Sequence, residues 1–264
     1  MGRLRLGPGR PLSLSVIEAP SPNFDRRRGP PDMIVLHYTG MESGEAALQR
    51  LRDPEAKVSA HYVVEEDGRV FGLVDEAHRA WHAGRGSWQG ETDVNAASIG
   101  IEIVNPGHEL GYRDFPEAQV EAVIALVGAV RERWSVPNVR VVGHSDIAPD
   151  RKEDPGERFP WKALAAAGHG LWFEPAMERV KALGAALADG DEGLGVHVLQ
   201  SGLHRLGYGI EVTGRYDGQT ACVVRAFQRH WRPAEVDGVA DGETRARLMG
   251  VLQLAQAESR TGVL

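Results

Sequence analysis

Two histidines and one aspartate are placed where they could together hold a catalytic metal ion. His37 and His144 each follow a short apolar run typical of a β-strand, and Asp154 comes ten residues after His144 in a stretch rich in turn formers. α/β proteins build their sites at the carboxyl ends of strands. Two histidines and a carboxylate are a common catalytic zinc set with one position open for water. Zinc lowers the pKa of such a water to about 7 and polarises carbonyl groups.

The spacing alone also fits a site without metal, because a histidine at a strand end is more often a hydrogen-bonded structural residue.

Glu102 is a further candidate for a functional residue. It alternates with isoleucines in the run Ser98–Val104, so Glu102 and Gly100 face the side of the strand opposite the isoleucines. A carboxylate there fits either a cleft or a solvated sheet face. Lys152 precedes Asp154 by two residues and, by position alone, fits an ordinary surface lysine.

The elements that must position these residues indicate an α/β domain. The expected strands are Met33–His37, His61–Glu65, Arg69–Val74, Ser98–Val104 and Val139–Gly143. Asp67-Gly68 is a strong hairpin signal between the second and third of them. Glu117–Trp134 carries an apolar stripe at helical spacing and follows Pro116. Ser43 is expected to cap a short helix that runs through Leu51.

Four segments are expected along the chain. They are an irregular N-terminal segment (1–31), the α/β domain (32–172), a helical linker (173–192) and a small helical module (193–264). Within the linker a helix is expected at 175–188. The module holds a weak repeat, Asp217-Gly218-Gln219-Thr220 and Asp241-Gly242-Glu243-Thr244, in which each Asp-Gly turn precedes a helix-like run.

Composition and charge narrow the class of protein. A chain of 264 residues has room for one medium domain and a small one. A net charge of −7 argues against a nucleic-acid partner, which favours a basic face. Cys222 is the single cysteine, so the chain forms no internal disulfide, and its apolar surroundings indicate a small core residue.

The N-terminal sequence gives an expectation about location. No apolar segment of the kind found in secretory signals follows the basic start, and no lipobox cysteine is present. The run Arg26-Arg27-Arg28 could suggest a twin-arginine export signal, but Gly29-Pro30 follows it rather than an apolar run. No stretch is long enough to span a membrane. With Met1 as the native start, we therefore expect a cytoplasmic protein without a membrane anchor.

Five blocks of sequence carry a resemblance to a known family. They are Leu36-His37-Tyr38-Thr39, Ser59-Ala60-His61-Tyr62-Val63-Val64, Ala80-Trp81-His82-Ala83-Gly84, Ser98-Ile99-Gly100-Ile101-Glu102-Ile103, and Gly143-His144-Ser145-Asp146-Ile147-Ala148-Pro149 through Gly156. In this order they closely resemble the type-2 N-acetylmuramoyl-L-alanine amidase family, the AmpD/AmiD group. One block alone is weak evidence, but the five together, over about residues 32–172, are specific.

The resemblance implies a fold and a set of roles. The fold would have a central mixed β-sheet flanked by helices, as in type-2 amidases and peptidoglycan-recognition proteins. His37, His144 and Asp154 would bind Zn²⁺, Glu102 would be the general base, and Lys152 would stabilise the oxyanion. The reaction would cleave the bond between N-acetylmuramic acid and L-alanine in muropeptides or peptidoglycan fragments.

Four aromatic residues in the matching blocks could line a substrate groove. They are His61, Tyr62, Trp81 and His82. An aromatic ring can stack on a sugar or a peptide, although tryptophan and tyrosine near a sheet more often serve packing.

The C-terminal module resembles the small three-helix peptidoglycan-binding domain, as in the AmiD-like branch. The resemblance is carried by Val198-Leu199-Gln200, Leu206-Gly207-Tyr208, Tyr216 through Thr220, Val224 through Arg229, and Val236-Asp237-Gly238. The alternative is that the apolar residues of these motifs only form a helical core.

Two rival functions follow from the same resemblance. A non-catalytic peptidoglycan-recognition protein shares the fold, but this chain retains all five residues that the family uses for metal binding and catalysis. The AmiD-like domain plan suggests an envelope enzyme, whereas the missing export signal favours recycling of soluble 1,6-anhydro-muropeptides in the cytoplasm. We expect the recycling role, and the sequence leaves the oligomeric state open.

Overall fold

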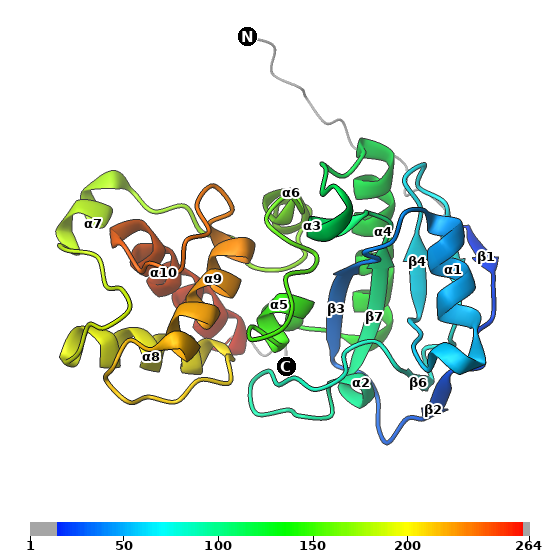
Figure 1. Cartoon of the computed structure of the whole chain (residues 1–264), viewed down its shortest axis with the longest axis horizontal. Coiled ribbons are helices and arrows are strands. Elements are labelled where there is room, and N and C mark those ends of the chain that lie inside the picture. Colours follow the sequence, from blue (N-terminus) through cyan, green and yellow to red (C-terminus); the bar gives the residue numbers. More distant parts are fainter. Residues whose placement is uncertain (1–14, 261–264) are drawn as a thin grey trace, which may run out of the picture.

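A mixed β-sheet forms the centre of the larger half of the molecule in a computed structural model, which describes residues 15–260 (Figure 1). Its six strands lie in the order β1-β5-β4-β7-β3-β8. They are β1 (Val16–Glu18), β3 (Met33–Tyr38), β4 (Tyr62–Val64), β5 (Val70–Gly72), β7 (Ser98–Ile103) and β8 (Val141–Gly143). All neighbouring strands are parallel except the β4–β5 hairpin. The expected mixed α/β fold is therefore confirmed.

The expectation that residues 1–31 are irregular is wrong for its described part. β1 adds to the sheet edge beside β5, and β2 (Phe24–Arg26) pairs antiparallel with β6 (His78–Ala80). These strands have three residues each, so they show too little alternation for a sequence pattern to reveal. Their pairing partners, which are distant in the sequence, stabilise them. Residues 1–14 lie outside the described part of the chain.

Local signals in the sequence place several elements correctly. Helix α4 (Glu117–Trp134) has the expected bounds. Helix α1 (Gly44–Arg52) begins where the side chain of Ser43 accepts the N–H of Ala46. The strand expected at 139–143 is shorter than expected, because the 3₁₀ turn η2 (Asn138–Arg140) precedes β8.

The long helix α4 covers one face of the sheet. Its apolar side chains form a buried cluster with the three isoleucines of β7 (Ile99, Ile101 and Ile103) and with Ile34 and Leu36 of β3. Gln119 lies inside this layer, where its amide group donates hydrogen bonds to the carbonyl oxygens of Val64 and Val104. The apolar face of β7 is thus buried under α4, and Glu102 faces the opposite side.

Several shorter helices complete the fold. They are η1 (Pro54–Ala56), α2 (Val94–Ala97), α3 (Gly107–Leu110), α5 (His144–Ile147), α6 (Trp161–Ala166) and α7 (Met177–Ala182). Helix α7 lies away from the sheet, against α10 (Gly242–Arg260) (Figure 1). The helix expected at 175–188 is wrong in its extent, because α7 ends at Ala182. Gly184 then adopts a positive φ of 69°, and Leu187 forms a bridge with Ala240.

The C-terminal module contains helices α8 (Leu194–Leu206), α9 (Gly218–Trp231) and α10 (Gly242–Arg260). The internal repeat marks two helix starts. Asp217 accepts the N–H of Thr220 at the start of α9, and Asp241 accepts the N–H of Thr244 at the start of α10. Each Asp-Gly turn therefore supplies an N-cap, which satisfies a free backbone N–H of the first helical turn.

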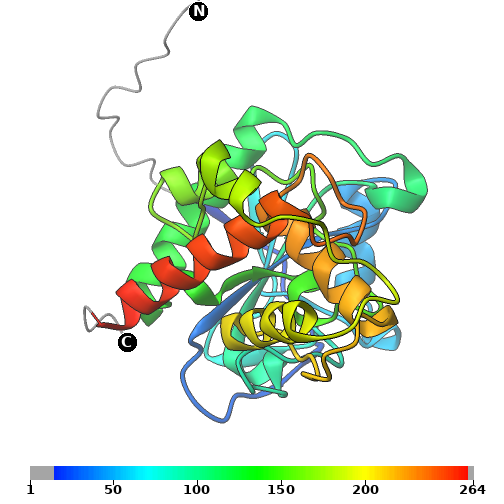
Figure 2. The same ribbon diagram turned by 90° about the vertical axis from the view of Figure 1, so that its left-hand side faces the viewer.

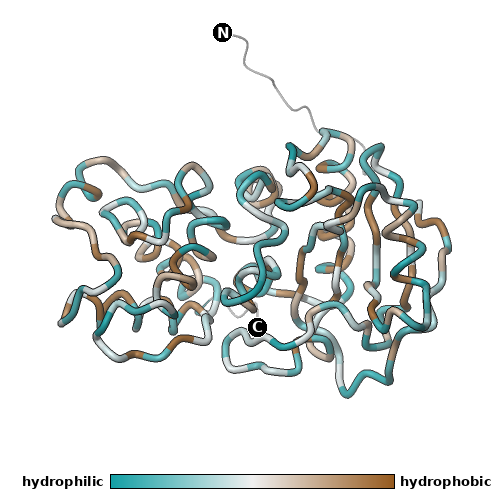
Figure 3. Tube along the Cα trace, in the orientation of Figure 1, coloured by the Kyte–Doolittle hydropathy of each residue, from teal (hydrophilic) through white to brown (hydrophobic). Residues whose placement is uncertain are grey.

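The module packs against the sheet domain through a continuous apolar core. One buried cluster contains Met33 and Val142 from the sheet together with Leu203, Phe227 and Trp231 from the module. Figure 1 shows α5 between the sheet and α9, and Figure 2 shows the module helices in front of the sheet. Apolar segments run through both halves in Figure 3. The two halves therefore share buried surface.

Within residues 15–260, no helix combines the length and the apolar character that a membrane crossing requires.

The aspartate cap of α9 predicts a measurable stability effect. We expect Asp217→Ala to lower the free energy of unfolding by about 1 kcal/mol and Tm by about 2–4 °C, because Thr220 loses its acceptor. Thermal unfolding followed by circular dichroism measures this. The control is Asp114→Ala, which removes an ion pair between Asp114, whose side chain is 85% exposed, and Arg158. An exposed pair contributes little, so equal losses in both variants would contradict the cap assignment.

Candidate active site

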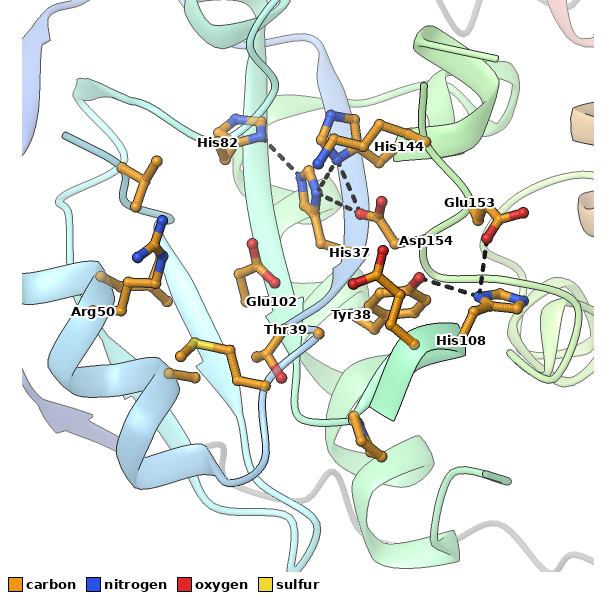
Figure 4. A pocket seen from close by; sticks show the side chains of 18 of the residues that line it. His37, Tyr38, Thr39, Arg50, His82, Glu102, His108, His144, Glu153 and Asp154 are labelled. Atoms are coloured by element: carbon orange, nitrogen blue, oxygen red, sulfur yellow. Dashed lines mark hydrogen bonds and ion pairs between the residues drawn. The ribbon is translucent and has the colours of Figure 1, made fainter. Parts of the chain in front are cut away.

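The structure brings His37, His144 and Asp154 together at the carboxyl ends of β3 and β8. The Nδ1 atoms of His37 and His144 lie 2.9 Å apart, and each lies 3.0 Å from Oδ2 of Asp154 (Figure 4). All three residues are buried. β3 and β8 are parallel neighbours, so their carboxyl ends meet at the same edge, and the loop after α5 returns Asp154 to it.

Hydrogen bonds to the far side of each ring assign the histidine tautomers. Nε2 of His144 lies 2.9 Å from the carbonyl oxygen of Ala83, which can only accept, so His144 carries its proton there. The hydroxyl group of Ser98 donates to the carbonyl oxygen of Val94 (2.5 Å) and therefore accepts from Nε2 of His82 (3.1 Å).

The same series of hydrogen bonds continues from His82 to His37. With its proton on Nε2, His82 presents a lone pair at Nδ1, which lies 3.0 Å from Nε2 of His37. His37 therefore donates to His82 and also presents a lone pair at its own Nδ1. His37 and His144 thus both aim unprotonated nitrogens at Asp154.

A cation fits this set of donors. Burial, together with the neighbouring His144, lowers the pKa of His37 to about 4. Asp154 is also buried, and its Oδ2 atom lies in contact with the nitrogens of both imidazole rings. Two neutral imidazoles and one carboxylate, with lone pairs converging within about 3 Å, repel one another unless a positive charge lies between them. Two histidines and a carboxylate suit zinc among the common metals.

Glu102 lies beside the ligands. It is the register partner of His37 across β3 and β7, so both side chains leave the sheet on the same face. Its Oε2 atom is buried and has no hydrogen-bond partner among the described residues. Burial raises the pKa of Glu102 well above its usual range, the charge of Asp154 raises it further, and Lys152 lowers it. A carboxyl group with a raised pKa suits proton transfer near neutral pH.

A cavity of about 410 Å³ opens over these residues. Lys152 lines it, as do Trp81 and His82 of the four aromatic candidates. Sequence reasoning missed several other lining residues: Arg50, His108, Glu109, Arg151 and Glu153. No motif marks Arg50, His108 or Glu109, because only the tertiary fold brings α1 and α3 to this opening. Arg151 and Glu153 fall within the fifth sequence block, beside Lys152 and Asp154.

The structure does not bring His61 or Tyr62 to this cavity. His61 is fully buried, accepts the N–H of Gly100 at 2.9 Å, and has its other ring nitrogen 2.9 Å from the guanidinium group of Arg27. Tyr62 donates its hydroxyl proton to Glu76 at 2.7 Å and lines a different hollow. Both side chains have partners elsewhere in the fold, so the groove assignment is corrected for them.

Gly100 explains how two of the sequence blocks fit together. A Cβ atom at Gly100 would lie 2.4 Å from the ring of His82. The absence of a side chain therefore lets the His82 ring lie against β7, where it reaches both Ser98 and His37.

Comparison with known proteins shows to which family the chain belongs. Residues 27–157 match the family model described as N-acetylmuramoyl-L-alanine amidase, and residues 192–248 match a peptidoglycan binding domain. The N-acetylmuramoyl-L-alanine amidase AmiD of Escherichia coli is 36% identical over 235 residues, covering 84% of this chain and 82% of AmiD. The chain belongs to the N-acetylmuramoyl-L-alanine amidase family.

Other relatives of the amidase agree with this assignment. The 1,6-anhydro-N-acetylmuramyl-L-alanine amidase AmpD of Haemophilus influenzae is 32% identical over 54% of this chain and 86% of its own length. The structure of E. coli AmiD with anhydro-N-acetylmuramic acid-L-Ala-D-gamma-Glu-L-Lys superposes with a TM-score of 0.73 at 34% identity, covering 86% of this chain and 90% of AmiD. AmpDh3 of Pseudomonas aeruginosa, in complex with anhydromuramic pentapeptide, gives 0.76 at 30% identity, covering 97% and 99%.

The bond between His37 and His82 predicts an effect on metal affinity. We expect His82→Phe to weaken the binding of a divalent metal about 10–100-fold, the usual effect of losing a partner that orients a ligand. His37 would then lack the acceptor that fixes its tautomer. Competition with a chromophoric chelator measures the Kd. His169→Phe removes a ring that contacts Arg131 and should leave the Kd unchanged. An unaltered Kd in His82→Phe would refute the tautomer assignment.

The raised pKa of Glu102 predicts a pH-dependent stability difference. The unfolded chain ionises Glu102 near its ordinary value of 4.5, whereas the folded protein holds the proton to higher pH. The native protein thus loses stability as pH rises above 4.5 until the folded pKa is passed. In metal-free protein, we expect Glu102→Gln to be more stable than the native chain at pH 8, with a difference that vanishes below pH 4.5.

Urea unfolding at several pH values measures this difference. Glu132→Gln, which changes an exposed carboxylate on α4, controls for the loss of one charge. A gain in stability of the same size at every pH would argue against a buried, protonated Glu102.

Proposed function

We propose that this chain is a zinc-dependent enzyme that hydrolyses the amide between the lactyl group of N-acetylmuramic acid and the L-alanine of the stem peptide. The observation that carries the proposal is the convergence of lone pairs from His37, His144 and Asp154 next to the carboxyl group of Glu102. A metal-assisted hydrolysis requires such a donor set with a proton-transfer group beside it. A recognition protein without catalysis has no need of this complete set.

Zinc held by the three ligands would polarise the scissile carbonyl group and make a water molecule more acidic. In this mechanism, Glu102 accepts a proton from the attacking water, because its raised pKa makes the carboxylate a sufficiently strong base. It then gives the proton to the departing amine of L-alanine. The Oε2 atom of Glu102, which no group of residues 15–260 hydrogen-bonds, is free to serve both steps.

Lys152 supplies the second charge that the reaction needs. Its side chain lines the cavity together with the ligands and Glu102. As the carbonyl group is attacked, negative charge grows on its oxygen, and an ammonium group there opposes it at low local dielectric. We therefore assign Lys152 to oxyanion stabilisation and Trp81, with His82, to the wall that contacts the substrate.

The proposed substrates are muropeptides, including those that carry a 1,6-anhydro sugar. Support comes from the relatives, since the structures of AmiD and AmpDh3 were obtained with anhydro-muramyl peptides. AmpD is named for the anhydro substrate as well. From this we infer a role in cytoplasmic recycling of peptidoglycan fragments.

A second role has its own support. The match of residues 192–248 to a peptidoglycan binding domain favours an enzyme that acts on larger peptidoglycan in the envelope. We assign residues 32–172 to the amidase domain, 173–192 to a linker and 193–264 to the module. Substrate size separates the two roles, because a recycling enzyme meets small fragments and an envelope enzyme meets sacculi.

The decisive experiment is mass-spectrometric analysis of products from anhydro-muropeptide, its non-anhydro counterpart and whole sacculi. Free peptide from the anhydro form with sacculi barely cleaved would support recycling. Comparable cleavage of all three would support the envelope role. Absence of cleavage by protein loaded with Zn²⁺ would refute the amidase proposal.

Glu102→Ala is the matched variant for this assay. We expect kcat to fall on the order of 10²–10⁴-fold, the usual contribution of a general acid–base group. Zinc content should stay intact, because Glu102 is not among the three ligands. Loss of zinc from Glu102→Ala, measured by elemental analysis, would contradict the assigned role.

A further inference from the structure

A buried carboxylate next to a metal ligand is held by the C-terminal module. Asp146 lies in α5, two residues after His144, and has no exposed surface. It accepts three hydrogen bonds: from the N–H of Gly143 (2.8 Å), from the hydroxyl group of Tyr208 (2.6 Å) and from Nδ1 of His230 (2.7 Å). Two of these three donors belong to the module, far along the chain from α5.

The ring of His230 is fixed in direction. It stacks between Trp161 and Trp231, with centroid distances of 3.6 Å on both sides and interplanar angles of 21° and 4°. A ring enclosed in this way cannot turn its Nδ1 away from Asp146. Because a buried carboxylate is costly unless its oxygens are hydrogen-bonded, α5 is tied to the place where His230 and Tyr208 meet it.

A second contact connects the C-terminal module with the segment of Asp154. The guanidinium group of Arg229, on α9, donates to the carboxylate of Glu153, the residue before Asp154. Arg229 is 9% exposed, so this pair lies at the edge of the buried interface. The N–H of Ser145 donates to the carbonyl oxygen of Asp154 at 2.9 Å and joins the two ligand segments.

The contacts from the module fall on residues that flank His144 and Asp154. The hydrogen bond from Gly143 to Asp146 also closes the turn from which His144 projects. We propose that Tyr208, His230 and Arg229 are positioning residues, which make the C-terminal module part of the frame that holds two of the three metal ligands. None of the three acts on substrate. The inference rests on the metal site proposed above.

The test compares two tyrosine variants of the full-length chain. Tyr208→Phe removes the hydroxyl group that reaches Asp146. Tyr216→Phe removes a hydroxyl group that is equally buried but donates to the carbonyl oxygen of Gly238 within the module (2.7 Å). The measurements are the Kd for Zn²⁺ alone by chelator competition, kcat and KM for a muropeptide at saturating Zn²⁺, and Tm.

We expect Tyr208→Phe to weaken Zn²⁺ binding about 10-fold, the lower end of the effect of outer-shell changes, and to lower kcat with KM little changed. Tyr216→Phe should reduce Tm similarly and leave the Kd and kcat at the native values. Equal Kd and kcat for the two variants would overturn the proposal.

His230 gives a second comparison that includes a rescue. The amide nitrogen of asparagine can donate from about the position of Nδ1, whereas leucine cannot. We therefore expect His230→Asn to bind Zn²⁺ more tightly than His230→Leu. Equal affinities would show that the hydrogen bond does not position α5. If His230→Leu does not fold, the tyrosine pair decides.

The outcomes separate this inference from the proposed function. Native protein that binds Zn²⁺ but cleaves no muropeptide would refute the amidase activity, while the Kd values would still test the positioning role. Native protein that binds no Zn²⁺ would refute both.

Discussion

The crowding of three electron-rich atoms is the constraint on which the rest of the site depends. Two imidazole nitrogens and one carboxylate oxygen lie within about 3 Å of one another, without a proton available between them. Such an arrangement is unfavourable by itself. The fold maintains it through the parallel register of β3 and β8, the carbonyl oxygen of Ala83, and the bonds from His37 through His82 to Ser98.

The same geometry explains the behaviour of the neighbouring carboxyl groups. Asp154 faces the nitrogens of two histidines at 3.0 Å, whereas Glu102 lies one strand away in a buried position that raises its pKa well above the usual range. The two acidic side chains therefore lie in different surroundings, Asp154 in the loop after α5 and Glu102 on β7. This difference supports the proposed roles of metal ligand for Asp154 and proton carrier for Glu102.

Much of this arrangement could be predicted from the sequence, because its signals are local or specific. The alternation around Glu102 sets its face, and the Asp-Gly turns mark the hairpin and the caps of α9 and α10. The ordered sequence blocks contain His37, His144 and Asp154, which the structure brings together. The rest depends on contacts between distant segments. The three-residue strands β1 and β2 have too little pattern of their own. The burial of His61 depends on Arg27 from the N-terminal segment, which no motif connects to it.

The link between Asp146 and the module has a consequence for the order in which the protein matures. A ribosome releases the chain from its N-terminus, and domains begin to fold as they emerge. Tyr208 and His230 leave the ribosome 62 and 84 residues after Asp146. Until then, Gly143 is the one described hydrogen-bond donor to this carboxylate, and Met33 and Val142 lack the module residues that complete their buried cluster. The nascent sheet therefore lacks these contacts, which form only near the end of translation.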